Sequence, residues 1–169
     1  MSQDILKKVL EVGISLSAEK DFNRLLEKIL INVMEITNCD AGTLYLLHDN
    51  SLHFKIMRND TMKTYQGGDG KESGLPPVPL TRASVCALSI IEDKTIVIDN
   101  VRQCDEYDLT GPIKYDAITG YYTCSMLVVP MKNRSGEQIG VLQLINAKDA
   151  EGKIVGFAKD LVPIVESLA

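Results

Sequence analysis

The sequence has little of what several large classes of protein require. Positive charge is in the minority, because 18 Lys and Arg stand against 23 Asp and Glu, which gives a net charge of -5 and a pI near 5.0. Nucleic-acid surfaces need clustered Lys and Arg. No apolar run reaches the roughly 20 residues that a membrane span needs. The chain also starts with the polar, acidic residues 1–4, unlike an export signal. We therefore expect neither nucleic acid nor membrane insertion.

Paired cysteines are also missing. The four cysteines stand at positions 39, 86, 104 and 124, and no two have C-x-x-C spacing. Zinc sites and redox pairs need closely spaced thiols. We expect reduced thiols in the cytoplasm, with Cys86 and Cys124 buried among apolar neighbours. The only histidines, His48 and His53, flank a tight turn, and two imidazoles alone make a poor metal site. No metal site is predicted.

What is present is a succession of helix and strand patterns. Apolar residues recur at helical spacing in the helices and in short runs in the strands. Asp21 is a typical N-cap for the second helix, which we expect to end at Asn38-Cys39-Asp40. The predicted helices cover residues 3–17, 22–37, 82–92 and 158–169, and the predicted strands cover 43–48, 52–57, 95–98, 125–131 and 138–145.

The strongest local pattern is a hairpin. Two apolar runs, 125–131 and 138–145, flank a polar turn in which Gly136 supplies a permissive backbone. Asp116, Thr119 and Thr123 precede the first of these strands. Small polar groups at the mouth of a buried hairpin favour a binding pocket over a catalytic site. They could equally cap a turn, as Asp and Thr often do.

Residues 59–80 and 99–122 are predicted to be irregular. The fold class is then α+β: one antiparallel sheet of about six strands, with the terminal helices on one face and a short helix and lid on the other. We define the lid as residues 82–122. The chain is expected to form a single domain over residues 1–169. Because no Gly or Asn ends the last helix, we expect a fragment of a longer multidomain signalling protein. Pro163 is tolerable only in that helix's first turn.

This order, together with residues 105–146, resembles the GAF domain of cyclic-nucleotide phosphodiesterases and of bacterial signalling proteins with HD-type phosphohydrolase or nucleotide-cyclase outputs. The resemblance rests on Asp116-x-x-Thr119-Gly-Tyr-x-Thr123, on residues 125–133, and on Gly136-Glu-x-Ile-Gly140 followed by Val-Leu-Gln-Leu-Ile-Asn146. It implies a ligand held between the sheet and the lid.

The resemblance also implies which residues contact that ligand. Asp116, Thr119 and Thr123 match the run that lines the pocket of cyclic-nucleotide-binding members. Thr43 matches a small hydroxyl that faces the ligand. The start of the lid helix could receive a phosphate at the backbone of Val85, Cys86 and Ala87.

Two stretches depart from the family pattern. Met57-Arg58 replaces an aromatic-acid pair, which removes a ring for base stacking. Asn146-Ala147-Lys148, followed by Phe157 and a lone Asp160, replaces the regulatory motif of the phosphodiesterases. Both departures weaken the expectation of a cyclic nucleotide, although neither affects the fold.

The sequence thus indicates a non-enzymatic sensory or regulatory domain. It would bind a small molecule, with a cyclic nucleotide as one candidate and no other cofactor. The terminal helices would form a homodimer and pass the signal to an attached output domain. One alternative is a dimerisation module with an empty pocket. Another is a GAF-fold methionine sulfoxide reductase that uses Cys86, Cys104 or Cys124, although no coherent catalytic set accompanies these cysteines.

Overall fold

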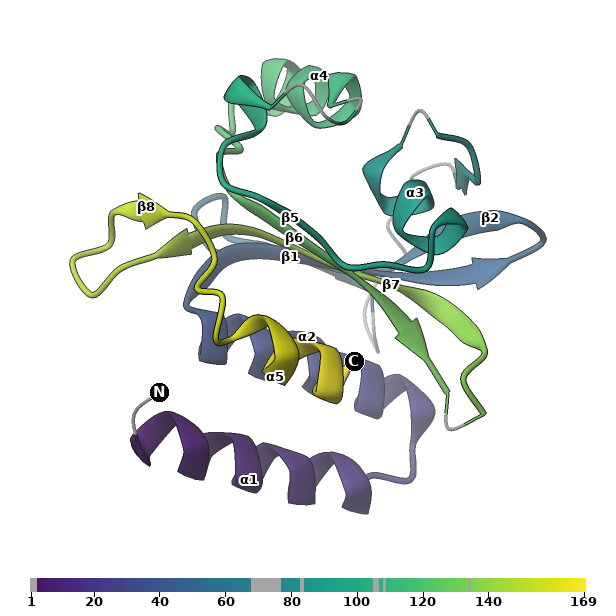
Figure 1. The fold of residues 1–169 in the computed structure, drawn as a ribbon, viewed down its shortest axis with the longest axis vertical. Helices are drawn as coiled ribbons and strands as arrows, with labels where there is room; N and C mark the ends of the chain where they lie inside the picture. Colours follow the sequence, from purple (N-terminus) through teal and green to yellow (C-terminus); the bar gives the residue numbers. More distant parts are fainter. Residues whose placement is uncertain (1–2, 68–76, 83, 105–106, 108, 134) are drawn as a thin grey trace.

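An antiparallel sheet separates two layers of helices in the computed structural model of the chain (Figure 1). The structure describes residues 3–67, 77–82, 84–104, 107, 109–133 and 135–169. Helices α1, α2 and α5 cover one face, and α3 and α4 lie over the other. The predicted α+β architecture is confirmed.

Within the described residues the sheet has eight strands, six of which form its continuous path. Along that path the order is β3-β2-β1-β7-β6-β5, while β4 pairs with β2 and β8 pairs with β7. The two central strands, β1 and β7, are antiparallel neighbours, as are β6 and β7 of the predicted hairpin. The strands are β1 (Cys39–His48), β2 (Ser51–Asn59), β3 (Thr64–Gly67), β4 (Val78–Pro79), β5 (Ile96–Ile98), β6 (Met126–Lys132), β7 (Gln138–Lys148) and β8 (Ile154–Val155).

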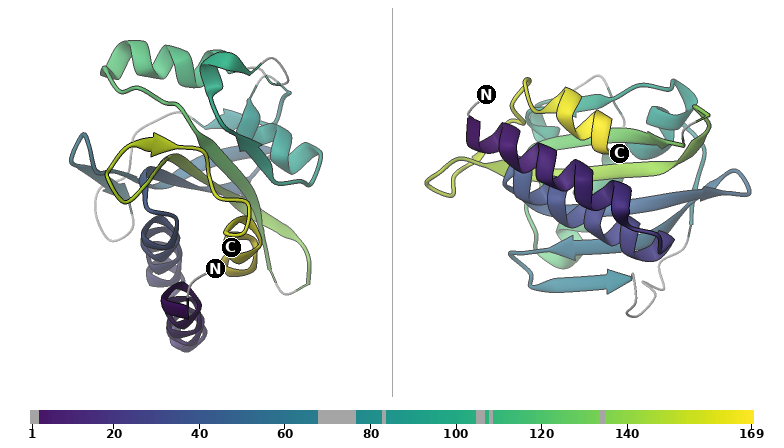
Figure 2. Two further views of the ribbon diagram at one scale, coloured as in Figure 1. Left: turned by 60° about the vertical axis from the view of Figure 1, so that its left-hand side comes forward. Right: turned by 90° about the horizontal axis from the view of Figure 1, so that it is seen from below.

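The helical layer on the first face consists of α1 (Gln3–Ala18), α2 (Phe22–Thr37) and α5 (Val162–Leu168). As predicted, Asp21 caps α2, because its carboxylate accepts hydrogen bonds from the amides of Asn23 and Arg24. Pro163 lies in the first turn of α5, where its missing N–H costs nothing. Figure 2 shows that α2 lies between α1 and the sheet, so α1 is the outermost helix.

Side-chain alternation along the central strands divides the core in two. Leu44 on β1 and Leu142 on β7 are fully buried against α2. Their neighbours Tyr45 and Val141 point to the opposite face and pack against α3 (Val85–Ile91). Because successive residues of a strand face opposite sides, every second residue of β1, β6 and β7 faces the lid.

The prediction of an irregular segment over residues 99–122 was wrong. The segment holds a short 3-10 helix, η1 (Val101–Gln103), and the ten-residue helix α4 (Thr110–Thr119). Helix α4 was not predictable from the sequence, because its apolar residues do not recur at helical spacing. In addition, Gly111 and Pro112 stand in its first turn, where Pro is tolerated.

Several smaller expectations were also wrong. The 59–80 segment contains β3 and β4 and is not wholly loop, although residues 68–76 lie outside the described part. The short β8 was not predicted. The last helix starts at Val162, later than the expected residue 158, and residues 39–40 begin β1 instead of ending a helix. Cys86 is buried as expected, but Cys124 is only half-buried.

Candidate functional site

Two polar side chains lie buried on the lid-facing side of the sheet, where apolar residues predominate. Thr43 on β1 pairs with Gln143 on β7, and Gln143 pairs in turn with Val128 on β6. Thr43 is 7% exposed and Gln143 is 8% exposed. Both therefore stand at the centre of the sheet, beneath the lid.

Gln143 is held by groups from three elements. Its Oε1 accepts a hydrogen bond of 3.0 Å from the Tyr45 hydroxyl and one of 3.4 Å from the Cys86 thiol, while its Nε2 donates to Met126 Sδ at 3.5 Å. A thioether is a weak acceptor. The amide nitrogen therefore retains donor strength for a better acceptor. Sequence reasoning missed Gln143, although a polar residue in the middle of an apolar strand was the available signal.

The hydroxyl of Thr43 takes part in no hydrogen bond within the described ranges. Every fully enclosed side-chain nitrogen or oxygen among the described residues has a hydrogen-bond partner, so the Thr43 oxygen is not fully enclosed and is open to solvent or a ligand. Met57, the residue that replaces the family's aromatic ring, is directly opposite Thr43 on β2. Its neighbour Arg58 forms an ion pair with Asp60, in which Nε lies 2.8 Å from Oδ1. Thr43 and Gln143 thus present a donor and acceptor pair toward the lid.

Asp116, the leading candidate from the sequence, connects separate parts of the lid segment through hydrogen bonds. Its Oδ2 accepts hydrogen bonds from Arg102 Nη2 at 2.6 Å and from the Thr123 amide at 2.7 Å, and its Oδ1 accepts the Thr123 hydroxyl at 2.7 Å. The Arg102 guanidinium also stacks on the Tyr122 ring, 4.2 Å from its centroid. We call Arg102, Asp116 and Thr123 the lid clasp. The structure therefore brings Asp116 and Thr123 together.

Thr119 stands apart from the clasp. It is the last residue of α4, is half-buried, and its hydroxyl accepts a 3.3 Å hydrogen bond from the Tyr121 amide. Gly120 follows with φ of 78°, a left-handed conformation that ends the helix. In this geometry, Thr119 stabilises the turn that leads from α4 to β6.

The start of α3 is buried and its capping amide is occupied. Val85, Cys86 and Ala87 are each at most 5% exposed, and the Ser84 hydroxyl accepts a hydrogen bond from the Ala87 amide. Burial raises the pKa of the Cys86 thiol to about 12. Cys86 therefore contributes a neutral thiol to the candidate site. The Ala87 amide is free to bind a phosphate only if Ser84 moves.

A second polar cluster ties the end of the lid to the sheet. The Tyr121 hydroxyl donates to Asp40 Oδ2 at 2.6 Å and accepts from Asn146 Nδ2 at 2.9 Å. Lys148 Nζ lies 3.4 Å from Asp40 Oδ1. Burial would raise the pKa of Asp40, but hydrogen bonds from Thr61 and Tyr121 and the Lys148 charge together hold it below its ordinary value. Burial, together with the Asp40 carboxylate, raises the pKa of Tyr121.

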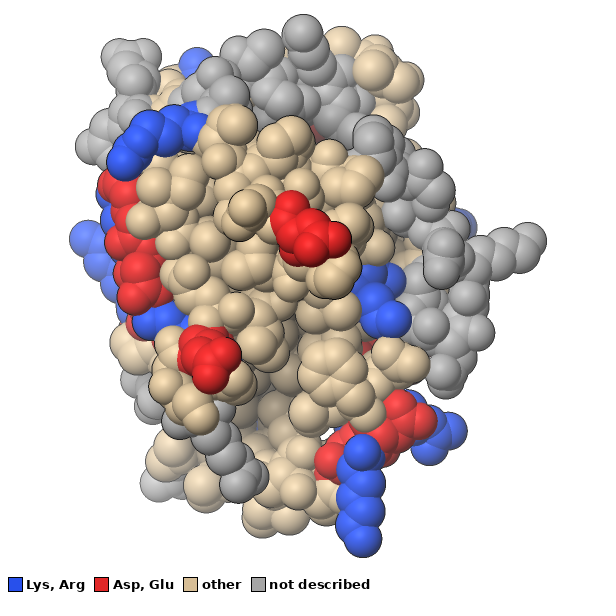
Figure 3. Space-filling model, turned by 90° about the vertical axis from the view of Figure 1, so that its right-hand side faces the viewer, with Lys and Arg blue, Asp and Glu red and all other residues tan. Residues whose placement is uncertain are grey.

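Nucleic-acid, metal and membrane sites were sought among the described residues. The face in Figure 3 is largely uncharged, and the Lys and Arg side chains drawn on it form no continuous basic patch. Among the described residues, no three His, Cys, Asp or Glu side chains are grouped as metal ligands. His48 and His53 lie with ring centroids 5.7 Å apart on the β1–β2 hairpin. None of the helices in the described ranges has the length and apolar character to cross a membrane.

Comparison with known proteins adds a family and a set of similar folds. The family model described as "GAF domain" matches residues 21–169. A Drosophila melanogaster protein named dual 3',5'-cyclic-AMP and -GMP phosphodiesterase 11 is 27% identical over an alignment of 153 positions, which covers 79% of this chain but 9% of that protein. The chain thus spans less than a tenth of this curated relative.

Solved structures share the fold at low sequence identity. The GAF domain of an Acinetobacter phosphoenolpyruvate-protein phosphotransferase superposes with a TM-score of 0.73 at 14% identity, over 99% of this chain and 89% of that one. The free methionine-R-sulfoxide reductase of Neisseria meningitidis, in complex with its substrate, gives 0.65 at 16% identity, over 99% and 87%. At such identities the likeness extends to the fold alone.

Proposed function

The chain belongs to the GAF family, a small-molecule-binding regulatory fold, and we propose that it is a sensory domain whose ligand lies between the sheet and the lid. The observation that carries this proposal is the pair formed by Thr43 and Gln143. Gln143 Nε2 donates only to a thioether, a weak acceptor, and the Thr43 hydroxyl takes part in no hydrogen bond within the described ranges, so both groups are available to a ligand. In a purely structural layer, an apolar residue at this position would pack better.

The chemistry of the site suits a heterocycle with both donors and acceptors. Thr43 can donate and accept, Gln143 Nε2 can donate, and Asp116 Oδ1 accepts only one hydrogen bond, from Thr123, among the contacts described above. These groups match the edge of a purine. A cyclic nucleotide is the ligand that we would test first, because the fly relative is named as a phosphodiesterase of cyclic AMP and cyclic GMP.

The signal would leave the domain through its helices. Ligand contacts that change the lid would alter the packing of α1, α2 and α5, and an attached output domain would respond to that shift between two arrangements. The four free thiols support the cytoplasm as the compartment.

Calorimetry and thermal unfolding test the proposal with cyclic AMP, cyclic GMP, the corresponding 5'-nucleotides and adenosine as probes. A ligand at 100 times its Kd stabilises the folded state by about 2.7 kcal/mol. Thr43→Val and Gln143→Leu should reduce that stabilisation. Thr64→Val, on the exposed edge strand β3, is the matched control and should preserve it.

Thr43→Val also separates ligand binding from folding. Without ligand this variant should be as stable as the parent chain, because it removes a hydroxyl that has no partner among the described residues. The proposal fails if no probe stabilises the chain and native mass spectrometry of the purified protein finds no bound small molecule.

Dimerisation is a second candidate function, favoured by the outer face of α1. Leu6, Leu10 and Ile14 recur at every fourth residue and are 51%, 62% and 72% exposed. Such a stripe usually has a partner. An open groove lies beside it, lined by Val9, Leu10, Gly13, Ile14, Ser17, Ala18 and Leu168. If a second copy covers this face, sedimentation should show a dimer that Leu10→Gln weakens and that Lys7→Gln, on the same helix, does not.

The reductase alternative has less support. A catalytic cysteine acts as a thiolate, and burial gives Cys86, the thiol bound to Gln143, a pKa of about 12. At neutral pH Cys86 is therefore protonated. The domain is proposed to be regulatory and not an enzyme.

A further inference from the structure

Tyr121 joins the end of the lid to the first strand of the sheet. It is 8% exposed and directly follows Gly120, the residue that ends α4. Its hydroxyl is held from two sides, since it donates to Asp40 at 2.6 Å and accepts from Asn146 at 2.9 Å. Asp40 lies 81 positions earlier in the chain. The contact is thus a long-range tie between the lid and β1.

Asn146 fixes the same stretch of chain from the other side. Its Oδ1 accepts hydrogen bonds from the amides of Cys124 and Ser125, and its Nδ2 also donates to the carbonyl of Tyr122. It has φ of 60°, a left-handed conformation that non-glycine residues adopt rarely. The contacts to residues 121–125 hold Asn146 in this conformation, so the lid end and β7 are ordered together.

The far side of this cluster is the C-terminal end of α2. Asn38, the C-cap of α2, receives the Lys148 amide on its carbonyl at 2.9 Å. The Asn38 side chain donates to the Lys148 carbonyl at 2.9 Å, and the Lys148 ammonium lies 3.4 Å from Asp40. The groups that hold Tyr121 therefore immediately adjoin those that end α2.

We propose that Tyr121, Asp40 and Asn146 form a joint that orders the end of the lid and the end of α2 together, so that a change in the contacts at the joint loosens both sides. This inference depends on the proposed function in one respect only, namely that the stimulus is a ligand that moves the lid. It assigns a route by which a change above the sheet reaches the helical layer below, through one hydroxyl at the ends of the two central strands. Coupling of this kind is reciprocal.

Hydrogen exchange of the ligand-free chain, followed by mass spectrometry, tests the joint. Tyr121→Phe should accelerate exchange about tenfold in residues 117–125 and also in residues 34–41, since it removes one hydrogen bond to a buried carboxylate. Arg102→Gln is the control, because it opens the lid clasp without touching the joint. It should accelerate exchange in the lid and leave residues 34–41 unchanged.

The reverse experiment starts from α2. Asn38→Gly keeps the left-handed C-cap, where Asn38 has φ of 52°, and removes only the side chain. Faster exchange should then appear in residues 117–125. The joint is refuted if Tyr121→Phe loosens the lid alone, or if Arg102→Gln loosens residues 34–41 equally. Because no ligand is used, this failure would leave the ligand proposal standing, and an unsuccessful ligand screen would leave the joint standing.

Discussion

Arg102 and Asp116 form an ion pair with Nη2 2.6 Å from Oδ2, in which the Asp116 side chain is 4% exposed and the Arg102 side chain 29%. The same carboxylate accepts both the amide and the hydroxyl of Thr123. Asp116 is therefore a structural clasp as well as a candidate ligand contact. The contacts in the structure fit the turn-capping interpretation of its sequence motif, and the ligand contact is a proposal.

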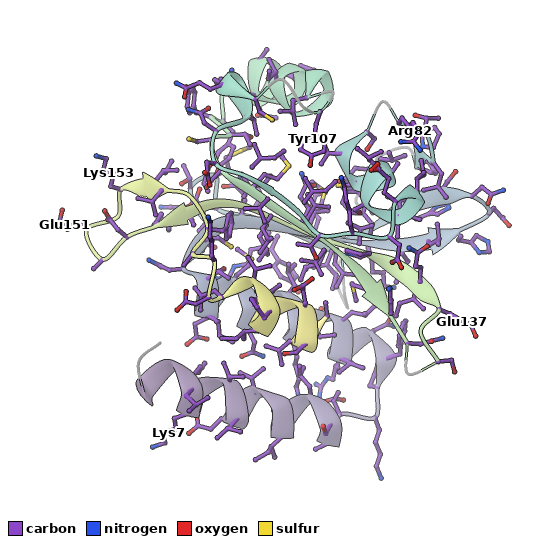
Figure 4. The ribbon with its side chains drawn as sticks, viewed as in Figure 1. Lys7, Arg82, Tyr107, Glu137, Glu151 and Lys153 are labelled. Atoms are coloured by element: carbon purple, nitrogen blue, oxygen red, sulfur yellow. The ribbon has the colours of Figure 1, made fainter. Side chains whose placement is uncertain are left out.

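Removal of this carboxylate should destabilise the chain without any ligand. Asp116→Ala leaves two buried Thr123 donors without an acceptor, so we expect the free energy of unfolding to fall by about 1–3 kcal/mol. Asp116→Asn retains one acceptor oxygen and should cost less. Urea denaturation measures the free energy of unfolding of both variants. Glu151→Ala, in the exposed turn at the edge of Figure 4, is the control and should change stability by less than about 0.5 kcal/mol.

Acid stability should depend on Asp40. Its folded-state pKa is lowered, so its contribution to stability is complete above the unfolded-state value of about 3.9 and is lost as pH falls through the folded value. Lys148→Met removes one of the groups that lower the Asp40 pKa. The acid-unfolding midpoint, followed by circular dichroism, should then move to higher pH. Lys153→Met makes the same change at an exposed position, and an equal shift there would contradict the role of Asp40.

Local patterns in the sequence were enough to predict most of the fold. The β6–β7 hairpin follows from two apolar runs and a turn, and the start of α2 follows from Asp21. In α4, tertiary contacts outweigh the local pattern: the buried Asp116 holds the helix through the clasp, and no apolar stripe marks it. Tyr107 of the lid lies between α4 and α3 (Figure 4), packed against the core beneath α3.

The candidate site was only partly predictable for a similar reason. Thr43 was found through a family resemblance, and Gln143 could have been found as a polar residue in an apolar strand. The contact between Tyr121 and Asp40 had no local signal, because the two residues are 81 positions apart and meet only when β1 and β7 pair. Long-range polar contacts of this kind depend on register, which one sequence does not specify.

The pairing of β1 with β7 should be sensitive to one glycine. A Cβ added to Gly140 would lie 2.0 Å from the backbone oxygen of Tyr45, which only a shift of the strands could relieve. Gly140→Ala should therefore lower the free energy of unfolding by about 1–3 kcal/mol or more. Gly13→Ala is the contrast, since nothing lies within 4 Å of its added Cβ and α1 should gain about 0.5–1 kcal/mol. The Tm of Gly140→Ala should fall below that of the parent chain, and the Tm of Gly13→Ala should rise above it.

The four thiols should react in two classes. Cys39 and Cys86 are buried, and burial raises the pKa of each to about 12, whereas Cys104 and Cys124 are half-buried. Because the thiolate is the reactive form, a disulfide reagent should modify Cys104 and Cys124 first in the native chain and all four only after denaturation. Mass mapping of the modified peptides identifies the sites, with Cys104→Ser and Cys124→Ser each removing one rapid reaction. Rapid native labelling of Cys86 would contradict the closed packing of α3 against Gln143, and would revive the reductase alternative.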